Sequence, residues 1–311
     1  MMPRPGNEDP RLDEALQFVQ SPDFVPAESQ PARVAFDREG PGLHFRFPTP
    51  RPSEFVENNL VYGRLYRCAR AWQERPVIVL LHGGGDSLGY RFRYPLMCRQ
   101  CNRAGFNAAT LVSPYHFQRR PQHAKALRWP NYLRLAEATA QAIAEIRAFT
   151  AWLLAEGCPA VALWGFSLGG RLAGFTACHQ ARLTSVVLAA PSVRLNLSFP
   201  ETVFWRRARE TLLAERPAWE ALNRASFNLA LSQPAISKEN ILLIEAAHDL
   251  FVGKEGIEEL WRTWGEPEMW RLPHGHVTKA PLPGLTGRVL RWLAPRLRDG
   301  AFSNECDRQP T

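Results

Sequence analysis

The chain has 311 residues, of which 45% are hydrophobic and 22% charged, a composition typical of a globular protein with one large or two small domains. Its net charge is +8, but only four of the 38 basic residues are lysines and no dense basic run occurs, so we expect no nucleic-acid partner. No apolar run reaches the ~20 residues that a membrane span needs, and the N-terminus has no apolar signal segment, so we expect a cytoplasmic protein without a membrane span.

The N-terminal part of the chain is expected to contribute an extension and a small lead-in sheet. Residues 1 to about 30 are rich in Pro, Asp, Glu and Gln, which favours a loosely ordered extension. Between Arg33 and Arg67, short runs with strand character are separated by Pro and Gly, which indicates antiparallel strands. The apolar runs Val77–Leu81 and Phe106–Val112 then predict two fully buried strands.

The six cysteines are scattered, as expected for free thiols in a reducing compartment. Cys98 and Cys101 form a CxxC pair, but no second pair and no histidine at metal-ligand spacing accompanies it. We therefore expect these two cysteines on one face of a helix, and we predict no metal site.

Strands and helices alternate in the rest of the chain. Apolar residues recur at three- and four-residue steps from Asn131 to Glu156, which predicts a long helix that Gly157 ends. Further strands are predicted at AVALW, TSVVLAA, ILLIEAA and EPEMWRL, with helices between them. This alternation predicts an α/β fold with a mostly parallel sheet covered by helices on both faces. We predict one domain over residues 31–311, with a helical insertion, or cap, over about 192–237 after the sixth strand.

The stretch AVALWGFSLGGRL contains the pattern G-x-S-x-G around Ser167. An apolar strand precedes it and a helix is predicted after it, which is the context of a nucleophile elbow, where a serine sits on a strained strand-to-helix turn. The pattern alone is weak evidence, because a chain of this length contains it by chance in roughly one case in ten at the usual frequency of Gly. A serine needs a base, and the base needs an acid, before it can act as a nucleophile.

The chain supplies both partners in the order that the elbow requires. Asp249 follows the strand at ILLIE, and His276 lies in PHGHVT after the last predicted strand. Upstream, HGGG follows the first buried strand, so backbone N–H groups of Gly84 and Gly85 could form an oxyanion hole together with that of Leu168.

These motifs together resemble the α/β-hydrolase superfamily, and more narrowly its bacterial abhydrolase-domain proteins, over about Leu60 to Leu297. The motifs that carry the resemblance are HGGG at 82–85, GFSLGG at 165–170, LLIEAAHD at 242–249 and GH at 275–276. The resemblance implies a triad of Ser167, Asp249 and His276, and hydrolysis of an ester, thioester or amide without a cofactor. It also implies that His82 supports the oxyanion loop. The chain departs from the family at Ala246, where the acid loop usually carries glycine.

Two positions of the triad have competitors nearby. Glu245 stands at the strand end and could orient a histidine, although the family spacing favours Asp249. His274 lies two residues before His276, and the family places the base after a glycine, as Gly275 does here.

Substrate contacts are predicted in two segments. The loop SPYHFQRRP follows the second buried strand, where His116 and Arg119 could contact an acidic substrate, or could belong to a solvated loop whose arginines pair with helix ends. In the cap, Trp205 could line an acyl pocket together with Phe204 and Trp219, or these aromatic residues could pack the cap onto the body.

The sequence therefore predicts a carboxylesterase-like serine hydrolase that acts on a small-molecule ester. A thioesterase or a serine peptidase would use the same residues, and a non-catalytic binding protein on a hydrolase scaffold is a further alternative. The sequence predicts neither the substrate nor the oligomeric state.

Overall fold

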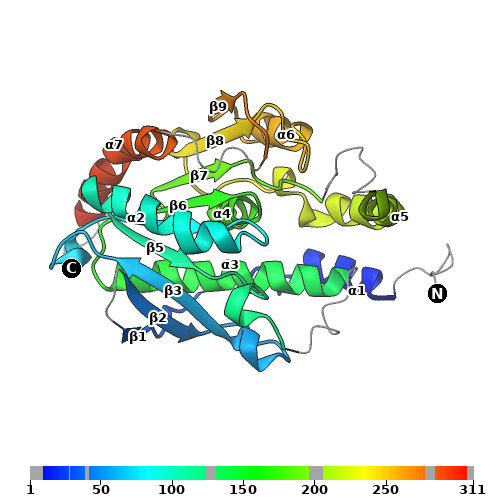
Figure 1. The fold of residues 1–311 in the computed structure, drawn as a ribbon, viewed down its shortest axis with the longest axis horizontal. Coiled ribbons are helices and arrows are strands. Elements are labelled where there is room, and N and C mark those ends of the chain that lie inside the picture. The colour runs from blue at the N-terminus through cyan, green and yellow to red at the C-terminus, as the bar shows by residue number, and fades with distance from the viewer. Residues whose placement is uncertain are drawn as a thin grey trace.

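A nine-stranded sheet forms the centre of the computed structural model, which describes residues 10–27, 29–38, 42–122, 131–195, 206–276 and 284–306 (Figure 1). The strands run in the order β1-β2-β3-β5-β4-β6-β7-β8-β9 across the sheet. Their bounds are β1 Ala35–Arg38, β2 Leu43–Pro48, β3 Leu60–Tyr66, β4 Val77–Leu81, β5 Asn107–Leu111, β6 Val161–Phe166, β7 Ser185–Ala189, β8 Ile241–Ala246 and β9 Glu268–Leu272.

The sheet has an antiparallel edge and a parallel remainder, as the sequence predicts. Strands β1, β2 and β3 pair antiparallel, and β3 pairs antiparallel with β5. From β4 onward all pairings are parallel. Every residue of β4, β5, β7 and β8 is buried, because helices cover both faces of this part of the sheet.

Seven α-helices are described in these parts of the chain. They are α1 Pro10–Gln20, α2 Tyr94–Arg103, α3 Tyr132–Ala155, α4 Leu168–Cys178, α5 Arg206–Leu222, α6 Glu255–Thr263 and α7 Leu285–Cys306. Shorter helical turns are η1 Val56–Asn59, η2 Trp72–Glu74, η3 Gly89–Arg93, η4 Phe117–Arg119, η7 Asn223–Phe227, η8 Leu229–Leu231 and η9 Lys238–Asn240. No helix among the described residues is long and apolar enough to cross a membrane.

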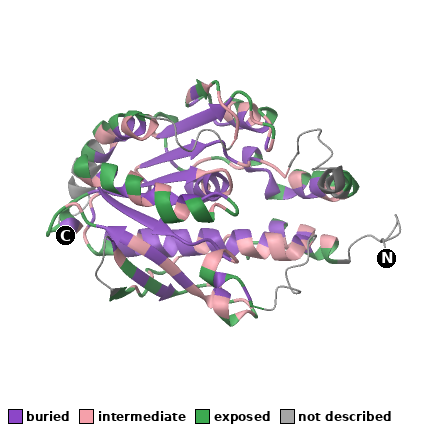
Figure 2. Ribbon diagram, in the orientation of Figure 1, coloured by how far each residue is buried: buried purple, intermediate pink, exposed green. Residues whose placement is uncertain are grey.

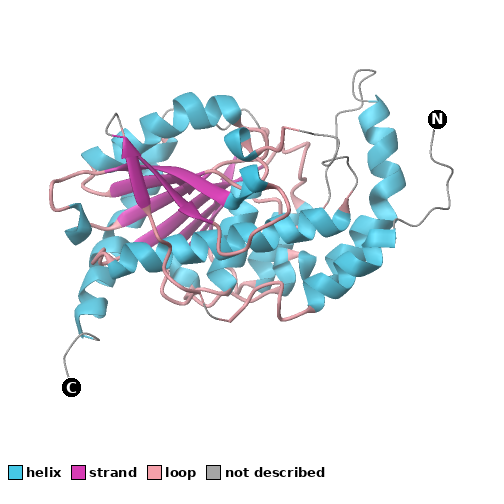
Figure 3. Cartoon of the chain, turned by 90° about the horizontal axis from the view of Figure 1, so that it is seen from below, coloured by secondary structure: helices cyan, strands magenta, loops and turns pink. Residues whose placement is uncertain are grey.

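The helices form two layers, one on each face of the sheet, as Figure 3 shows from below. Helices α3, α4 and α6 pack against one face and share its apolar core. Helices α2 and α7 pack against the opposite face. Cys98 and Cys101 are both buried in this second core, on the sheet-facing side of α2. Figure 2 shows the central strands buried and the outer surfaces of α2 and α7 exposed.

The N-terminal extension is more ordered than the sequence analysis expected. Residues 10–20 form α1, and its Ala15 and Val19 are buried against α3. The expectation of a loose segment is therefore wrong for this part, while residues 1–9 lie outside the described residues. The reason is that Leu12, Ala15, Leu16 and Val19 have the spacing of an apolar helix face, which the surrounding Pro, Asp and Glu obscure.

The predicted helical insertion lies between β7 and β8. It therefore follows the seventh strand and not the sixth, because the N-terminal antiparallel part of the sheet contributes three strands. Its main helix, α5, packs on α1, and the two helices lie at the same end of the molecule (Figure 1). Trp219 and Leu222 of α5 are buried with Tyr132 of α3 in a small separate core. Residues 196–205 of the insertion lie outside the described residues.

Candidate active site

Ser167 lies on a tight turn between β6 and α4. Its backbone has φ 53° and ψ −115°, a conformation that costs a non-glycine residue free energy. The turn is possible because glycines flank it. A Cβ atom on Gly165 would lie 2.1 Å from the carbonyl oxygen of Gly169, and one on Gly169 would lie 2.1 Å from that of Leu81. These contacts explain the two glycines of G-x-S-x-G in physical terms.

His276 connects Ser167 to Asp249. Its Nε2 lies 2.9 Å from the Ser167 hydroxyl oxygen, and its Nδ1 lies 2.6 Å from Oδ2 of Asp249. The side chains of His276 and Asp249 are only 10% and 2% exposed. The structure thus brings together three residues that are far apart in the sequence and that come from three different strand-following loops.

Asp249 is held as a carboxylate. Burial alone would raise the pKa of Asp249, but the hydrogen bond and charge of His276 and the backbone N–H groups of Val252 and Phe251 outweigh burial, and the pKa is lowered. Those N–H groups donate to Oδ1 at 3.1 and 3.0 Å. A carboxylate can only accept, so Nδ1 of His276 carries a hydrogen, and in the neutral ring Nε2 would be the acceptor that faces Ser167.

The two competing residues have other roles. Glu245 faces Arg271 across the β8–β9 pair, and its Oε2 lies 3.1 Å from Nε of Arg271. His274 is held through its backbone, whose N–H donates to the carbonyl of Leu272 at 2.7 Å. Of the two neighbouring histidines, His276 is the one that reaches Ser167.

The glycine loop lies against the elbow. A Cβ on Gly83 would lie 3.0 Å from the ring of Phe166, and one on Gly84 would lie 3.9 Å from the side chain of Leu168. Gly85 has φ 68°, a region that favours glycine. The loop between β4 and α2 therefore lies next to the start of α4, which is the arrangement that an oxyanion hole requires.

The side chain of His82 holds the glycine loop in place. It is fully buried, its Nδ1 lies 2.8 Å from the carbonyl oxygen of Gly83, and its Nε2 accepts from the N–H of Ser113 at 3.0 Å. Burial lowers its pKa to about 3, so the ring is neutral and Nδ1 donates. His82 thus joins the glycine loop to the loop that follows β5.

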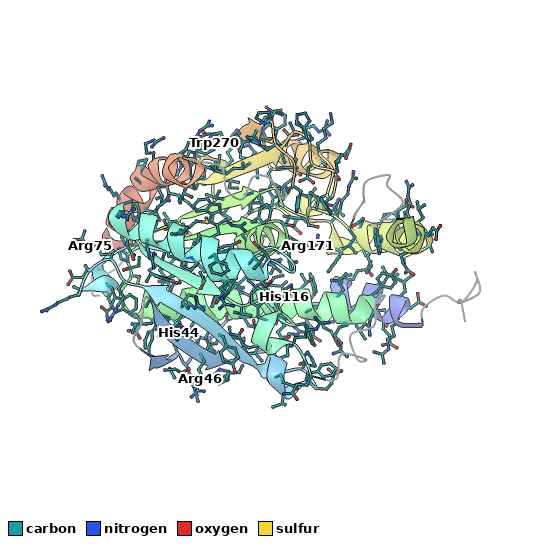
Figure 4. The ribbon with its side chains drawn as sticks, viewed as in Figure 1. His44, Arg46, Arg75, His116, Arg171 and Trp270 are labelled. Carbon is teal, nitrogen blue, oxygen red and sulfur yellow. The ribbon has the colours of Figure 1, made fainter. Side chains whose placement is uncertain are left out.

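A cavity of about 230 Å³ lies beside the elbow, between α3, α4 and the loop after β5. Its lining residues are Ser113, Pro114, Tyr115, His116, Asn131, Arg134, Leu135, Ala138, Thr139, Ala142, Leu168 and Leu172. Leu168 and Leu172 belong to the first two turns of α4, so the cavity begins directly after Ser167. His116, which the sequence predicts as a substrate contact, lies on its wall next to α3 (Figure 4).

Arg119 is not available to a substrate, which corrects the sequence prediction. Its side chain is 0% exposed and forms an ion pair of 2.6 Å with Glu145 of α3. It also donates to the carbonyl oxygens of Val112 and Asn58, at 2.7 and 2.6 Å. A buried arginine in this environment fixes the loop after β5 to the body of the protein. The other predicted contact in this group, Trp205, lies outside the described residues.

Two features of the site are missed by the sequence analysis. The N-terminal half of α3 lines the cavity, with Leu135, Ala138 and Ala142 at helical spacing, whereas the sequence suggests only that α3 covers the sheet. The one sequence signal for a cavity at this helix face was the small size of its alanine side chains.

The second missed feature is Arg171, which lies on α4 one turn after Ser167 and is fully buried (Figure 4). Its guanidinium donates to the carbonyl oxygens of Ser192 and Val193, each at 3.0 Å, and to that of Phe227. The backbone N–H of Arg171 also donates to the backbone carbonyl of Ser167. Burial lowers its pKa to about 9. Arg171 therefore joins the elbow helix to both ends of the insertion, a contact that no local sequence pattern indicates.

A mostly parallel sheet with a serine on a strand-to-helix turn defines the α/β hydrolase fold. The model of one protein family, alpha/beta hydrolase domain containing 18, matches residues 56–216. The chain belongs to this family, within the α/β hydrolase superfamily that its motifs resemble. No group of three or more His, Cys, Asp or Glu residues that could hold a metal ion occurs among the described residues.

The chain is also similar to one further protein in sequence and to solved structures in fold. An uncharacterized protein of Mycobacterium tuberculosis is 26% identical over 248 residues, which cover 73% of this chain and 57% of the relative. The chain thus spans a little over half the length of that relative. An acetyl xylan esterase from Paenibacillus sp. R4 has a similar fold, with a TM-score of 0.60 and 17% identity, over 94% of this chain and 96% of that one. An esterase of Pyrococcus furiosus has a TM-score of 0.56 and 16% identity, over 86% and 97%.

Proposed function

We propose that the protein is a serine hydrolase that cleaves a small-molecule carboxylic ester through an acyl-enzyme. The observation that carries this proposal is the continuous hydrogen-bonded chain from Asp249 through His276 to Ser167. In the proposed mechanism, Nε2 of His276 takes the hydroxyl proton as Ser167 attacks the ester carbonyl, and returns it to the leaving alcohol. Water activated by the same nitrogen then releases the acyl group, and Asp249 stabilises the imidazolium in both steps.

The developing oxyanion needs donors that are already in place. In the proposed site these are the backbone N–H groups of Leu168 and of Gly84 or Gly85. The closeness of the glycine loop to the start of α4 supports this assignment, because a Cβ atom on Gly84 would lie 3.9 Å from the side chain of Leu168. His82 contributes only by holding the loop, since it is neutral and both its ring nitrogens are engaged.

The cavity beside α4 would receive the acyl group. Leu135, Ala138, Ala142, Leu168 and Leu172 give it an apolar wall, while His116 and Arg134 lie at its polar side. Arg134 already pairs with Glu54 and lies 4.9 Å from the ring of Phe55, which leaves the apolar wall as the main recognition surface. The esterases of similar fold support an ester substrate as well.

A fluorophosphonate probe tests the proposal, because it reacts covalently with an activated serine. We expect labelling at Ser167, together with turnover of p-nitrophenyl esters that exceeds turnover of acyl-CoA and peptide substrates. Faster turnover of acyl-CoA would identify a thioesterase, and faster turnover of a peptide would identify a peptidase. A folded protein that the probe does not label, and that cleaves none of these substrates, would be a binding protein instead.

Filling the cavity is expected to shorten the range of accepted acyl chains. Ala138→Trp places a large ring in the cavity, so turnover of long-chain p-nitrophenyl esters should fall by about 10- to 100-fold relative to the acetate ester. Initial rates over a series of chain lengths measure the effect. Ala155→Trp, at the exposed end of the same helix, is the matched control and should leave the profile unchanged. An unchanged profile in Ala138→Trp would place the acyl group elsewhere.

The two acidic residues are expected to behave differently. Asp249→Asn removes the carboxylate that orients His276, so kcat should fall by about 10⁴. Glu245→Gln should leave kcat within about tenfold of wild type, a barrier change of at most about 1.4 kcal/mol, because Glu245 faces Arg271 and not His276. Steady-state kinetics on one ester compare the two variants. The assignment of the acid is wrong if the larger loss occurs in Glu245→Gln.

A further inference from the structure

The outer surface of α2 carries an exposed apolar stripe. Leu88, Phe92 and Leu96 are 72%, 60% and 54% exposed, and they follow one another at four-residue steps along η3 and α2. The opposite side of the same helix is buried, through Tyr94 and Cys98. Side chains at this spacing lie on one helix face, so the stripe points away from the core.

Arginines continue this surface onto the neighbouring helix. Arg103 of α2 and Arg291 and Arg298 of α7 are exposed and line a groove of about 470 Å³ between the two helices. Phe106, Leu290 and Ala294 also line this groove and give it apolar walls. Arg99, one turn before Arg103, is exposed as well. Figure 1 shows α2 and α7 as neighbours on the same side of the sheet, where they share one core.

The positive charge of this surface is not neutralised locally. Asp86 is the single acidic residue between Glu74 and Glu137, and it pairs with Arg93. Within the described part of the chain, none of the four arginines of the surface forms an ion pair with a carboxylate. The part of α7 from Leu285 to Arg298 contains four arginines and no acidic residue, and Asp299 follows it.

We propose that this α2–α7 surface, formed by Leu88, Phe92, Leu96, Arg99, Arg103, Arg291 and Arg298, docks on a membrane surface that contains anionic phospholipid. Apolar side chains beside arginines on an exposed helix are the combination that binds the interface of an anionic bilayer. The apolar residues would enter the acyl boundary, and the arginines would meet lipid phosphates. Contact with a second copy is disfavoured, because a twofold interface would bring the same cationic surfaces together.

Docking through the stripe would also bring Ser167 close to the membrane. Leu88 follows the glycine loop Gly83–Gly85 by three residues, and a Cβ on Gly83 of that loop would lie 3.0 Å from the ring of Phe166, the residue before Ser167. A protein bound through the stripe would hold this loop and Ser167 close to the bilayer. The docking itself does not depend on catalysis, and it can be measured with an inactive variant.

Co-sedimentation with vesicles tests the proposal. At low salt we expect the protein to pellet with vesicles of phosphatidylcholine and phosphatidylglycerol but not with phosphatidylcholine alone, and to be released by salt. The Phe92→Ser/Leu96→Ser variant should bind at least about tenfold more weakly, since burial of each side chain is lost. The Arg103→Gln/Arg291→Gln variant should lose about fivefold for each arginine.

Matched controls come from the opposite face of the molecule. Leu231→Ser and Arg262→Gln change an exposed leucine and an exposed arginine there, and both should bind as the wild type does. Thermal melts of all variants establish that they fold. The proposal is overturned if the wild type does not bind the anionic vesicles, or if the α2–α7 variants bind them as tightly as the controls do. It is also overturned if Phe92→Ser/Leu96→Ser instead dissociates a dimer in analytical ultracentrifugation.

Discussion

The Ser167→Ala variant is expected to lose ester turnover by about 10⁶ in kcat, as nucleophile removal does in other triads that act as a unit. The hydroxyl oxygen lies 2.9 Å from Nε2 of His276, and alanine leaves no atom there to attack a carbonyl. Labelling by a fluorophosphonate probe should disappear together with turnover. Kinetics on a p-nitrophenyl ester and gel-based labelling measure the two effects.

The fold should survive this substitution, because Ser167 is half-buried and its backbone hydrogen bonds to Ala189 and Arg171 do not involve the side chain. Ser167→Gly should be equally inactive but more stable by up to about 1 kcal/mol, since glycine relieves the positive φ. Ser192→Ala changes a neighbouring serine and should keep its activity. Turnover close to that of wild type in purified Ser167→Ala would refute the proposed function.

His276→Ala should lose nearly as much turnover as Ser167→Ala, whereas His274→Ala should stay within about tenfold of wild type. The reason is geometric, because His276 alone of the two bridges Ser167 and Asp249 in the structure. The paired variants differ by two positions in one loop, so each controls for the effect of the other on loop stability. A dead His274→Ala variant beside an active His276→Ala variant would reverse the assignment.

The pH dependence provides an independent check on the base. A protonated His276 could not accept the Ser167 proton, so kcat/KM should fall on the acid side of the pH profile. Asp249 should not add a second limb there, because its pKa is lowered below the ordinary carboxyl value and it stays ionised. His274→Ala should retain the acid limb, and loss of the limb in that variant would contradict the assignment.

Much of the fold could be predicted because it is encoded locally. The buried strands are short continuous apolar runs, and α3 has a clear helical period, so each shows its type in its own residues. The elbow is only partly local, since Gly165 is required by the carbonyl of Gly169, four residues away, whereas Gly169 is required by the carbonyl of Leu81 on β4. Helix α1 was not predicted because a helix this short is only marginally stable by itself, and its apolar face is stabilised by packing against α3.

The residues that line the substrate site were harder to predict, because the type of a residue does not show which other residue it contacts in the folded protein. Arg119 in a polar loop suggested an anionic substrate, but its charge is matched by Glu145, which lies on a different element. Likewise, Leu135 and Ala138 looked like residues that cover a sheet, and only the path of α3 past α4 turns them towards a cavity.

The sequence by itself determined the class of fold, the order of the candidate nucleophile, acid and base, and the glycines that allow the turn at Ser167. These features depend on spacing along the chain and on local backbone geometry. The family pattern favoured His276 over His274, but only the tertiary structure shows that His276 meets Ser167, that Glu245 pairs with Arg271, and that Arg171 joins the elbow to the insertion. Each of these choices depends on distances of a few ångströms between segments far apart in sequence, which arise only when the sheet brings the loops at its carboxyl edge together.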